Sequence, residues 1–397
     1  MSVLVHKHFL GTPRHALIKD SMLRWTDAPE DYDLTYGVSG SHESIEPLLN
    51  IFKIEIPELV PPQFKRAMET CGDPHPPWSE VLPKALYNSR LKSLLGSLSK
   101  AITKIKSSEY FEVYKKSNNV FPMLRPSTLE VEKCKAILNS EDNHVIRGIL
   151  RSSRDGLCQV PVYDRASTKT GRLTIKDGPQ VLTLKKEYRS IFKASKEGSK
   201  IFEVDFSSLE PRVASNIAQR SPGSDVYLSF MEYSGIRISR DASKLAVLCA
   251  LYGASTYSLQ KQLREQGSTV SASSLIQKVN DYFDIGALAA GLKKAAGTEG
   301  VINNYFGRPI SVDDARPAVL VNNYLQSTAV DVSLLGFERI CSDLQDLISP
   351  LFIIHDAMFF EAQERYLTKV SEYLSNGFAI EGLGNFPLKV TEVMTNE

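Results

Sequence analysis

The chain has 397 residues, of which 42% are hydrophobic and 23% are charged, and its formal net charge is +1. These fractions are typical of a folded soluble protein, and the length indicates two or three subdomains. The small net charge gives no overall indication of nucleic-acid binding, so local clusters of charge are more informative. The five cysteines show no Cys-x-x-Cys spacing. They argue against a zinc site and a disulfide framework, and a reducing, intracellular setting fits them best.

No apolar run approaches the length of a membrane span, so no membrane partner is expected. The first residues, MSVLVHKHFLGTPRH, lack the apolar core of a signal peptide. They contain no acidic residue before Asp20, which leaves organellar targeting open. A cytoplasmic location is the main expectation.

Residues 1–83 read as irregular, with Pro and Gly clusters such as GDPHPPW at 72–78, and their role cannot be read from the sequence. From Leu91 to Ile105 the apolar residues follow helical spacing, with lysines between them. The segment 84–116 is rich in Lys and Arg and poor in acidic residues, so it carries a positive surface. Such a helix can lie along a phosphate backbone, although a solvated surface helix is the commoner meaning of the pattern.

Farther along, residues 127–150 read as helical and 157–195 as short strands and turns that include TGRL at 170–173. A strand ends at Asp205, and a helix follows it to about Ala218. Helices are expected over 237–296 and after the turn at 303–309. A hairpin over 351–361, a helix and a final strand complete the chain. Strands and helices without regular βαβ alternation indicate the α+β class.

Two aspartates stand at the ends of apolar, strand-like runs that are far apart in the sequence. Asp205 ends the run that begins at Ile201, and Glu210 follows five residues later. The run LFII at 351–354 leads directly to His355 and Asp356. Two aspartates held on rigid strands are what a magnesium-dependent phosphoryl-transfer centre needs, since Mg²⁺ prefers hard oxygen ligands.

A basic helix is predicted between these two runs, over RDASKLAVLCALYG. Arg240, Lys244, Leu248 and Tyr252 advance by about 40° each and share one broad face. Two cations on this face could bind a triphosphate, with an aromatic ring where a sugar or base could pack. A surface helix with two ordinary charges is the alternative.

These segments resemble the motifs of family A DNA polymerases, the bacterial polymerase I type. DFSSLEPR at 205–212 is similar to motif A (DYSQIELR), the basic helix to motif B (R-x3-K-x7-YG), and IIHDA at 353–357 to motif C (VHDE). Supporting matches are TGRL, FGRP at 306–309 and NNYLQSTAVD at 322–331. The matches occur in the family's order over roughly 165–397.

The resemblance implies a right-hand polymerase fold, with an antiparallel palm sheet and helical fingers and thumb. The expected divisions are an N-terminal extension (1–83), thumb (84–160), first part of the palm (161–219), fingers (220–315) and second part of the palm (316–397).

The resemblance also implies roles for single residues. Asp205, Asp356 and the backbone carbonyl of Phe206 would hold two Mg²⁺ ions, for which Mn²⁺ could substitute. Arg240 and Lys244 would bind the incoming triphosphate, and Lys244 is a candidate acid for the departing pyrophosphate. The other implied contacts fall into three groups. They are Glu210 and Tyr252, which would close the pocket against a ribose 2′-hydroxyl; Tyr227 and Leu248 beside the nucleotide; and Arg172, Asn322, Gln326, Arg308 and His355 on the primer–template.

Ordinary structural roles remain the alternatives for these residues. The aspartates could cap backbone donors in turns. Glu210 could form a helix-face salt bridge, and Tyr252 and His355 could belong to the core.

The sequence departs from the family pattern in several places. Leu248 replaces an aromatic residue, and Ala357 replaces the glutamate that follows the motif C aspartate. Ser208 and Pro211 also differ from the commoner Gln and Leu. No strand-like D-x-E precedes Asp205, and about 165 residues are too few for a thumb and a nuclease domain. We therefore expect a polymerase core without 3′→5′ or 5′→3′ nuclease activity.

The expected function is template-directed DNA synthesis from deoxynucleotides on a primer–template, by a monomer, in a bacterial or phage-infected cell. Phage or plasmid replication and repair synthesis are the expected roles, and any processivity partner is unknown. One alternative is a single-subunit RNA polymerase of the phage type, against which Glu210 argues because that class has a small residue there. Another is a primer–template binding protein that has lost catalysis, which the changes at Leu248 and Ala357 suggest.

Overall fold

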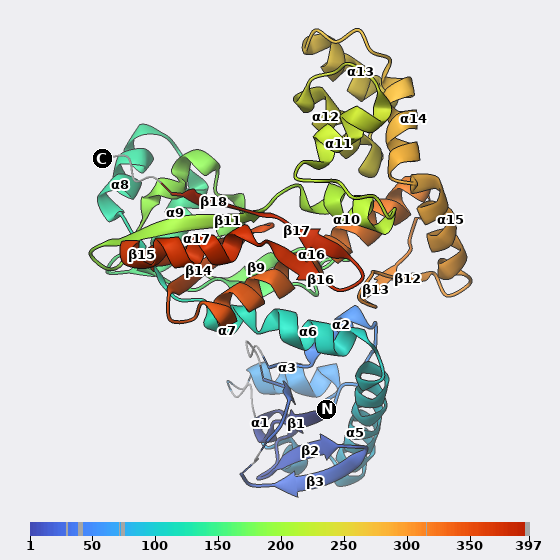
Figure 1. Ribbon diagram of the computed structural model, residues 1–397. Coiled ribbons are helices and arrows are strands. Elements are labelled where there is room, and N and C mark those ends of the chain that lie inside the picture. Colours follow the sequence, from blue (N-terminus) through green and yellow to red (C-terminus); the bar gives the residue numbers. More distant parts are fainter. Residues whose placement is uncertain (29–30, 39–42, 71, 73–75, 315, 394–397) are drawn as a thin grey trace. The chain divides into compact units, whose positions relative to one another are not determined.

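The computed structural model describes residues 1–397 except 29–30, 39–42, 71, 73–75, 315 and 394–397 (Figure 1). The chain forms two compact units, Met1–Glu112 and Val113–Glu397. The predicted thumb, 84–160, is therefore divided between the two units. No helix within the described residues is both long and apolar enough to cross a membrane.

The first unit contains a four-stranded sheet in the order β3-β2-β1-β4. The central strand β1 pairs antiparallel with β2 and parallel with β4, and its four residues are all buried. The prediction that 1–83 is irregular is therefore wrong, because short strands on either side of tight turns gave no long periodic signal. The elements are β1 (Ser2–Val5), α1 (Lys7–Leu10), β2 (His15–Lys19), β3 (Met22–Thr26), β4 (Leu34–Tyr36), α2 (Glu46–Ile51), α3 (Pro62–Thr70) and α4 (Trp78–Val81).

The lysine-rich helix predicted from Leu91 to Ile105 is confirmed as α5 (Lys84–Lys106), which also belongs to the first unit. It begins after Pro83. Proline suits a helix start, because the backbone N–H groups of the first turn have no acceptor within the helix. Leu94, Leu98 and Ile105 are fully buried along one side of it. Lys92, Lys100 and Lys104 are exposed. The helix α6 (Tyr110–Asn118) follows.

The second unit is built on an antiparallel sheet in the order β14-β15-β11-β18. Its strands are β11 (Ser199–Phe206), β14 (Ile348–Ile354), β15 (Ala357–Gln363) and β18 (Leu388–Glu392). Both faces are buried, so alternate residues enter two different hydrophobic clusters: Met358 and Phe360 belong to one, and Ala357 and Phe359 to the other. This explains why β14 and β15 read as continuous apolar runs in the sequence.

Several helices pack into the first of these clusters, among them α16 (Pro317–Asp343) and α10 (Leu209–Ile217). The long α16 and the short α10 contact each other there. Gly336 of α16 lies so close to β11 that an added Cβ would be 2.5 Å from the ring of Phe206. The helix α16 therefore supports the strand that carries Asp205.

A helical group lies between α10 and α16 in the sequence, and Figure 1 shows its helices packed on one another, in yellow-green to orange. The prediction of helices over 237–296 is confirmed. The elements are α11 (Val226–Ser234), α12 (Arg240–Leu251), α13 (Thr256–Glu265), α14 (Ala272–Tyr282) and α15 (Ile285–Ala296), followed by the hairpin of β12 (Val301–Asn303) and β13 (Pro309–Ser311).

The segment 127–150 differs from the single helical stretch predicted for it. It holds β5 (Ser127–Leu129), α8 (Val131–Ser140) and α9 (His144–Arg151). Asn143 caps α9 by accepting a hydrogen bond from the Ile146 backbone N–H, which explains the break.

The strands and turns predicted for 157–195 are confirmed, as are the helix and strand after 361. The remaining elements are α7 (Val120–Met123), β6 (Ser153–Arg154), β7 (Leu157–Cys158), β8 (Val162–Asp164), β9 (Thr174–Asp177), η1 (Val181–Thr183), η2 (Lys186–Ile191), β10 (Phe192–Lys193), η3 (Glu364–Tyr366), α17 (Leu367–Ser375), β16 (Phe378–Ile380) and β17 (Gly384–Phe386).

Candidate active site

The two predicted aspartates meet at one end of the central sheet. Asp205 lies near the end of β11 and is paired in register with Ala357, the first residue of β15. Asp356 lies in the two-residue turn between β14 and β15. The Phe206 backbone N–H donates a hydrogen bond of 3.3 Å to the Asp356 carbonyl oxygen, which joins the strand end to the turn. His355 takes a φ of 54°, so the turn is tight enough to require left-handed backbone from a non-glycine residue.

The surroundings disfavour two negative charges on these carboxylates. Burial, together with the charges of Asp356 and Glu203, raises the pKa of Asp205 to about 7. Burial, together with the charge of Glu210, also raises the pKa of Asp356. A divalent cation would remove this penalty, because it favours the ionised form of both groups. The donor set therefore fits hard cations such as Mg²⁺.

Few side chains in the described part of the chain are placed to act as ligands of a metal ion. Among the described residues, no group of three or more His, Cys, Asp or Glu side chains gathers to hold a metal ion. Mg²⁺ is commonly bound by one or two carboxylates together with substrate phosphates and water. A pair of aspartates is consistent with such a shared site.

A pocket of about 540 Å³ lies in front of the aspartates. Its walls come from β11, the start of α10, α11, α12, α16 and the motif C turn. The structure thus brings together residues predicted from five separate sequence segments. The predicted residues that line the pocket are Arg172, Asp205, Phe206, Glu210, Tyr227, Lys244, Leu248, Tyr252, His355 and Asp356.

Glu210 is the centre of a polar chain on one wall. Tyr252 donates a short hydrogen bond to one of its carboxylate oxygens, and Arg172 Nη2 donates to the other at 3.0 Å. Burial and this contact with Glu210 raise the pKa of Tyr252, so its hydroxyl keeps its proton. With the amide oxygen of Gln326 turned toward Arg172, it accepts from Nε and Nη2 at 3.2 and 3.1 Å, while the Gln326 nitrogen donates to Thr170 at 2.6 Å.

The cations of α12 differ in their surroundings. Lys244 is exposed and lines the pocket. Arg240, at the start of the helix, is not part of the lining; its Nε donates to Asp225 at 2.7 Å and its guanidinium lies 5.2 Å from the centre of the Tyr227 ring. Asp225 caps α11, and although burial opposes its ionisation, its bonds to Arg240 and to backbone amides lower its pKa.

Asp225 is a site residue that the sequence interpretation did not single out. Its signal is its position as a helix N-cap 15 residues before Arg240. A cap alone gives no indication of an arginine partner, so spacing could not have identified this pair.

Two of the residues predicted to contact the primer–template, Arg308 and Asn322, are fully or partly enclosed by the protein. Arg308 is only 2% exposed, and its guanidinium Nη2 donates to the carbonyl oxygens of Arg165 and Thr168, so we do not retain a direct nucleic-acid contact for it. Asn322 lies on α16, one turn before Gln326. The Oδ1 atom of Asn322 is buried, and within the described residues it has no hydrogen-bond donor. It is an acceptor that a ligand or water could satisfy after a small movement.

The comparisons with known proteins agree with this geometry. The chain matches a solved structure, the POL domain of Pol1 from M. smegmatis in complex with DNA primer-template and dNTP, with a TM-score of 0.64 and 13% identity, over 98% of this chain and 94% of that one. This likeness confirms the predicted α+β, right-hand polymerase fold. No curated protein matches the sequence at the level required for significance.

A family model also matches this chain, from about β6 to the final strand, and the matched range includes both aspartates. The model of DNA polymerase family A covers residues 152–395, which include the whole pocket. The resemblance seen in the motifs is thereby confirmed, and with it the expectation of a nucleotidyltransferase. This chain belongs to DNA polymerase family A and is a DNA-directed DNA polymerase.

Proposed function

We propose that the pocket is a nucleotidyl-transfer centre, at which deoxynucleotides are added to the 3′ end of a primer under the direction of a template. The observation that carries this proposal is the convergence of Asp205 and Asp356 in a pocket that Lys244 also lines. A pair of half-buried carboxylates together with a cation suits a reaction in which a triphosphate is attacked and pyrophosphate leaves.

Divalent ions belong to this proposal. Asp205, Asp356 and the Phe206 carbonyl would hold two Mg²⁺, with Mn²⁺ as a substitute. When bound, such ions activate a hydroxyl nucleophile and neutralise the charge of the leaving group. The chain's own contribution is to hold both carboxylates rigidly, through the β11–β15 ladder and the bond from Phe206 N–H to the Asp356 carbonyl.

The cationic face of α12 would bind and protonate the phosphates. Lys244 is the proposed acid, because it is exposed within the pocket and an ammonium can donate a proton to departing pyrophosphate. Arg240 would bind the triphosphate beside Tyr227. It is paired with Asp225, so nucleotide binding would have to compete with that carboxylate. Leu248 would contact the nucleotide without the aromatic stacking that the family pattern has there.

Glu210 and Tyr252 together form the proposed sugar gate. Their hydrogen bond fixes the carboxylate and the ring against each other on the pocket wall. A ribose 2′-hydroxyl would meet this closed pair without space or a free partner, so deoxynucleotides are preferred.

Arg172, Gln326, Asn322 and His355 are the proposed primer–template contacts. Arg172 and Gln326 are already joined on the pocket side of α16, and His355 is exposed in the turn that holds Asp356. Hydrogen bonds to the minor groove use acceptors present on every base pair, so these contacts would test shape and not sequence. The M. smegmatis structure contains primer-template and dNTP, and we propose the same partners here.

We propose the domain assignment given from the sequence: an N-terminal extension, then thumb, palm, fingers and palm. The remaining features are proposals of the same kind: a monomer, a cytoplasmic location, and a role in phage or plasmid replication or in repair synthesis. The absence of 3′→5′ and 5′→3′ nuclease activity in these 397 residues is also proposed, and incubation of labelled single strands and duplexes with magnesium would test it.

Single-turnover primer extension with magnesium tests the central proposal. We expect Asp205→Ala to reduce the rate of extension by at least about 10³-fold while primer–template binding is retained. Asp346→Ala, which removes an exposed aspartate from the same unit, is the matched control and should extend normally. If the wild type and Asp205→Ala are equally inert but both bind duplex, the protein is a primer–template binding protein. If the wild type prefers ribonucleotides, it resembles the single-subunit RNA polymerases instead.

A further inference from the structure

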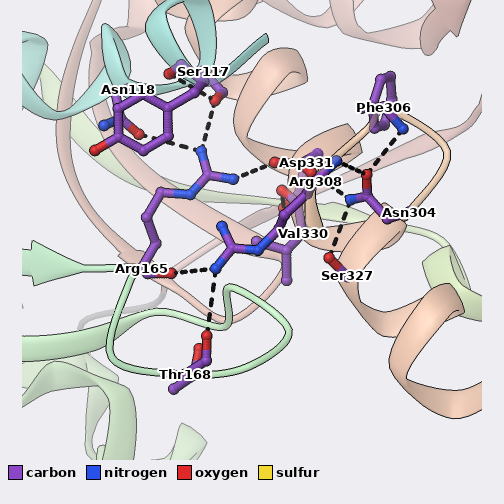
Figure 2. Close-up of polar contacts among 12 residues, drawn as sticks. Ser117, Asn118, Arg165, Thr168, Asn304, Phe306, Arg308, Ser327, Val330 and Asp331 are labelled. Atoms are coloured by element: carbon purple, nitrogen blue, oxygen red, sulfur yellow. Dashed lines mark hydrogen bonds and ion pairs between the residues drawn. The ribbon is translucent and has the colours of Figure 1, made fainter. Parts of the chain in front are cut away.

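A buried polar network lies behind the proposed primer–template contacts, and Figure 2 shows its side chains pointing toward one another. Arg165 Nη2 is paired with Asp331 of α16, and the two side chains are 3% and 0% exposed. The Nη1 atom of Arg165 donates to Ser117 Oγ at 2.6 Å and to Asn118 Oδ1 at 3.2 Å. The network thus joins α6, the segment after β8, and α16.

Asn304 connects the β12–β13 turn to the same aspartate. Its Nδ2 donates to Asp331 Oδ2 at 2.6 Å and to Ser327 Oγ at 3.1 Å. Its Oδ1 accepts from the backbone N–H groups of Phe306 and Arg308 at 3.0 and 2.9 Å. Arg308 is therefore fixed at its backbone by a residue that is itself held by α16.

The side chain of Arg308 extends from this turn under the loop that ends in TGRL. Its Nη2 donates to the carbonyl oxygen of Arg165 at 2.9 Å and of Thr168 at 3.4 Å (Figure 2). Gly171 packs directly on the guanidinium, because a Cβ there would lie 2.9 Å from Cζ. Gly171 also has a φ of +80°, so the close approach and the backbone both require glycine.

The loop on Arg308 ends in residues of the proposed site. Thr168 Oγ1 donates to the Arg172 carbonyl at 2.7 Å, which ties the contacted loop to Arg172. Thr170 bonds to Gln326, and the Arg172 guanidinium lies between Gln326 and Glu210. A displacement of the Arg308 guanidinium would therefore move Thr168 and Gly171, and with them Arg172.

We propose that Arg308 is a positioning residue that sets the place of Arg172, and through Arg172 the strength of the sugar gate formed by Glu210 and Tyr252. The inference rests on the proposed function, because it requires Glu210 to act in sugar selection, and it gives Arg172 a part in that selection besides its proposed contact with the primer–template. The guanidinium suits this role, because Gly171 packs on it while its Nη2 donates to two carbonyl groups of the loop. A lysine keeps the positive charge but has no planar group on which Gly171 could pack.

Two single variants displace the support in different ways. Arg308→Lys keeps the buried charge and loses the planar guanidinium, whereas Gly171→Ala keeps the arginine and adds a methyl group that pushes against it. Gly300→Ala is the matched control, since Gly300 also has a positive φ, +62°, but an added Cβ would meet nothing closer than the Val312 carbonyl oxygen at 3.8 Å. The readout is the ratio of kcat/KM for a deoxynucleotide to that for the matching ribonucleotide.

We expect Arg308→Lys and Gly171→Ala to lower this ratio by about three- to tenfold, and Gly300→Ala to leave it unchanged. A role in stability alone would lower the amount of active enzyme and leave the ratio as it is. An unchanged ratio in Gly171→Ala, which keeps every side chain of the network, overturns the inference even if Arg308→Lys fails to fold.

Arg172→Ala separates this inference from the proposed function. If Arg308 acts through Arg172, then Gly171→Ala should lower the ratio in the wild type and have no further effect in Arg172→Ala. A full additional effect in that background overturns the inference. If Arg172→Ala and Glu210→Ala both leave the ratio unchanged, the sugar gate itself is wrong and the inference fails with it. If those two lower the ratio while the Arg308 and Gly171 variants do not, only the inference fails.

Discussion

Glu210→Ala is the variant that most directly tests how this pocket selects its sugar. The Glu210 carboxylate is 15% exposed and is held on both oxygens, by Tyr252 and by Arg172. Truncation to alanine removes the carboxylate from the pocket wall and leaves the Tyr252 hydroxyl without its acceptor. A ribose 2′-hydroxyl could then occupy the vacated space and accept the hydrogen bond that Tyr252 loses.

The size of the effect follows from the hydrogen-bonding change. Leaving a buried hydroxyl without a partner costs about 1 to 3 kcal/mol, which corresponds to about 5- to 150-fold in a rate ratio. In the proposed sugar gate, Glu210 would impose that penalty on a ribonucleotide, and Glu210→Ala would remove it. We therefore expect the preference for deoxynucleotides, measured as the ratio of kcat/KM values, to fall by about 5- to 150-fold.

Single-nucleotide incorporation on a primed template, with each nucleotide in turn, measures this ratio. Glu210→Gln is the matched control, because the amide has the size of the carboxylate and its oxygen can still accept from Tyr252, whereas the ion pair with Arg172 is lost. We expect Glu210→Gln to lose less of the discrimination than Glu210→Ala, because only the ion pair with Arg172 is removed. A ratio in Glu210→Ala equal to that of the wild type would show that Glu210 is not the gate, and equal losses in both variants would show that charge and not shape excludes the 2′-hydroxyl.

Two further predictions concern DNA binding and packing. Replacing the exposed Lys92, Lys100 and Lys104 of α5 by alanine should weaken the salt dependence of duplex binding. The slope of log K against log salt should become less negative by about 2.7, since each of three phosphate contacts contributes about 0.9. An unchanged slope would show that α5 is not part of the DNA-binding surface. Gly336→Ala should lower the free energy of unfolding of the second unit in urea by about 1 to 3 kcal/mol, because the added Cβ would lie 2.5 Å from the Phe206 ring. Gly291→Ala is the control: nothing lies within 4 Å of its added Cβ, so this variant should raise the free energy of unfolding by about 0.5 to 1 kcal/mol. Equal effects of the two variants would contradict overpacking at Gly336.

Much of the second unit could be predicted because its signals are local. Asp205 lies one residue before the end of β11, and Asp356 lies two residues beyond β14; both strands are rich in apolar residues, and α12 has a regular helical spacing of its cations. The first unit could not be predicted in this way. Its β3 strand, Met22–Thr26, is mostly exposed, and β1 and β4 are short, so neither alternation nor a long apolar run identified the sheet.

The placement of Arg308 shows the limit of reading residues one at a time. An arginine beside a site motif suggests a contact with phosphate, because most arginines are exposed. Here two carbonyl groups from a loop more than 130 residues earlier surround its guanidinium, and only the folded chain reveals that enclosure.

The amino-acid sequence alone determined which residue types are available for the proposed chemistry and which local elements present them: aspartates near strand ends, a cationic helix, and an acid at a helix start with a tyrosine at a helix end. The tertiary structure alone decided which of them meet, because a contact between distant segments depends on strand register and helix packing, and neither is written in any one segment. It placed Asp205 beside the Asp356 turn, joined Glu210 to Tyr252 and Arg172, paired Arg240 with Asp225, and buried Arg308 beneath the loop of Gly171.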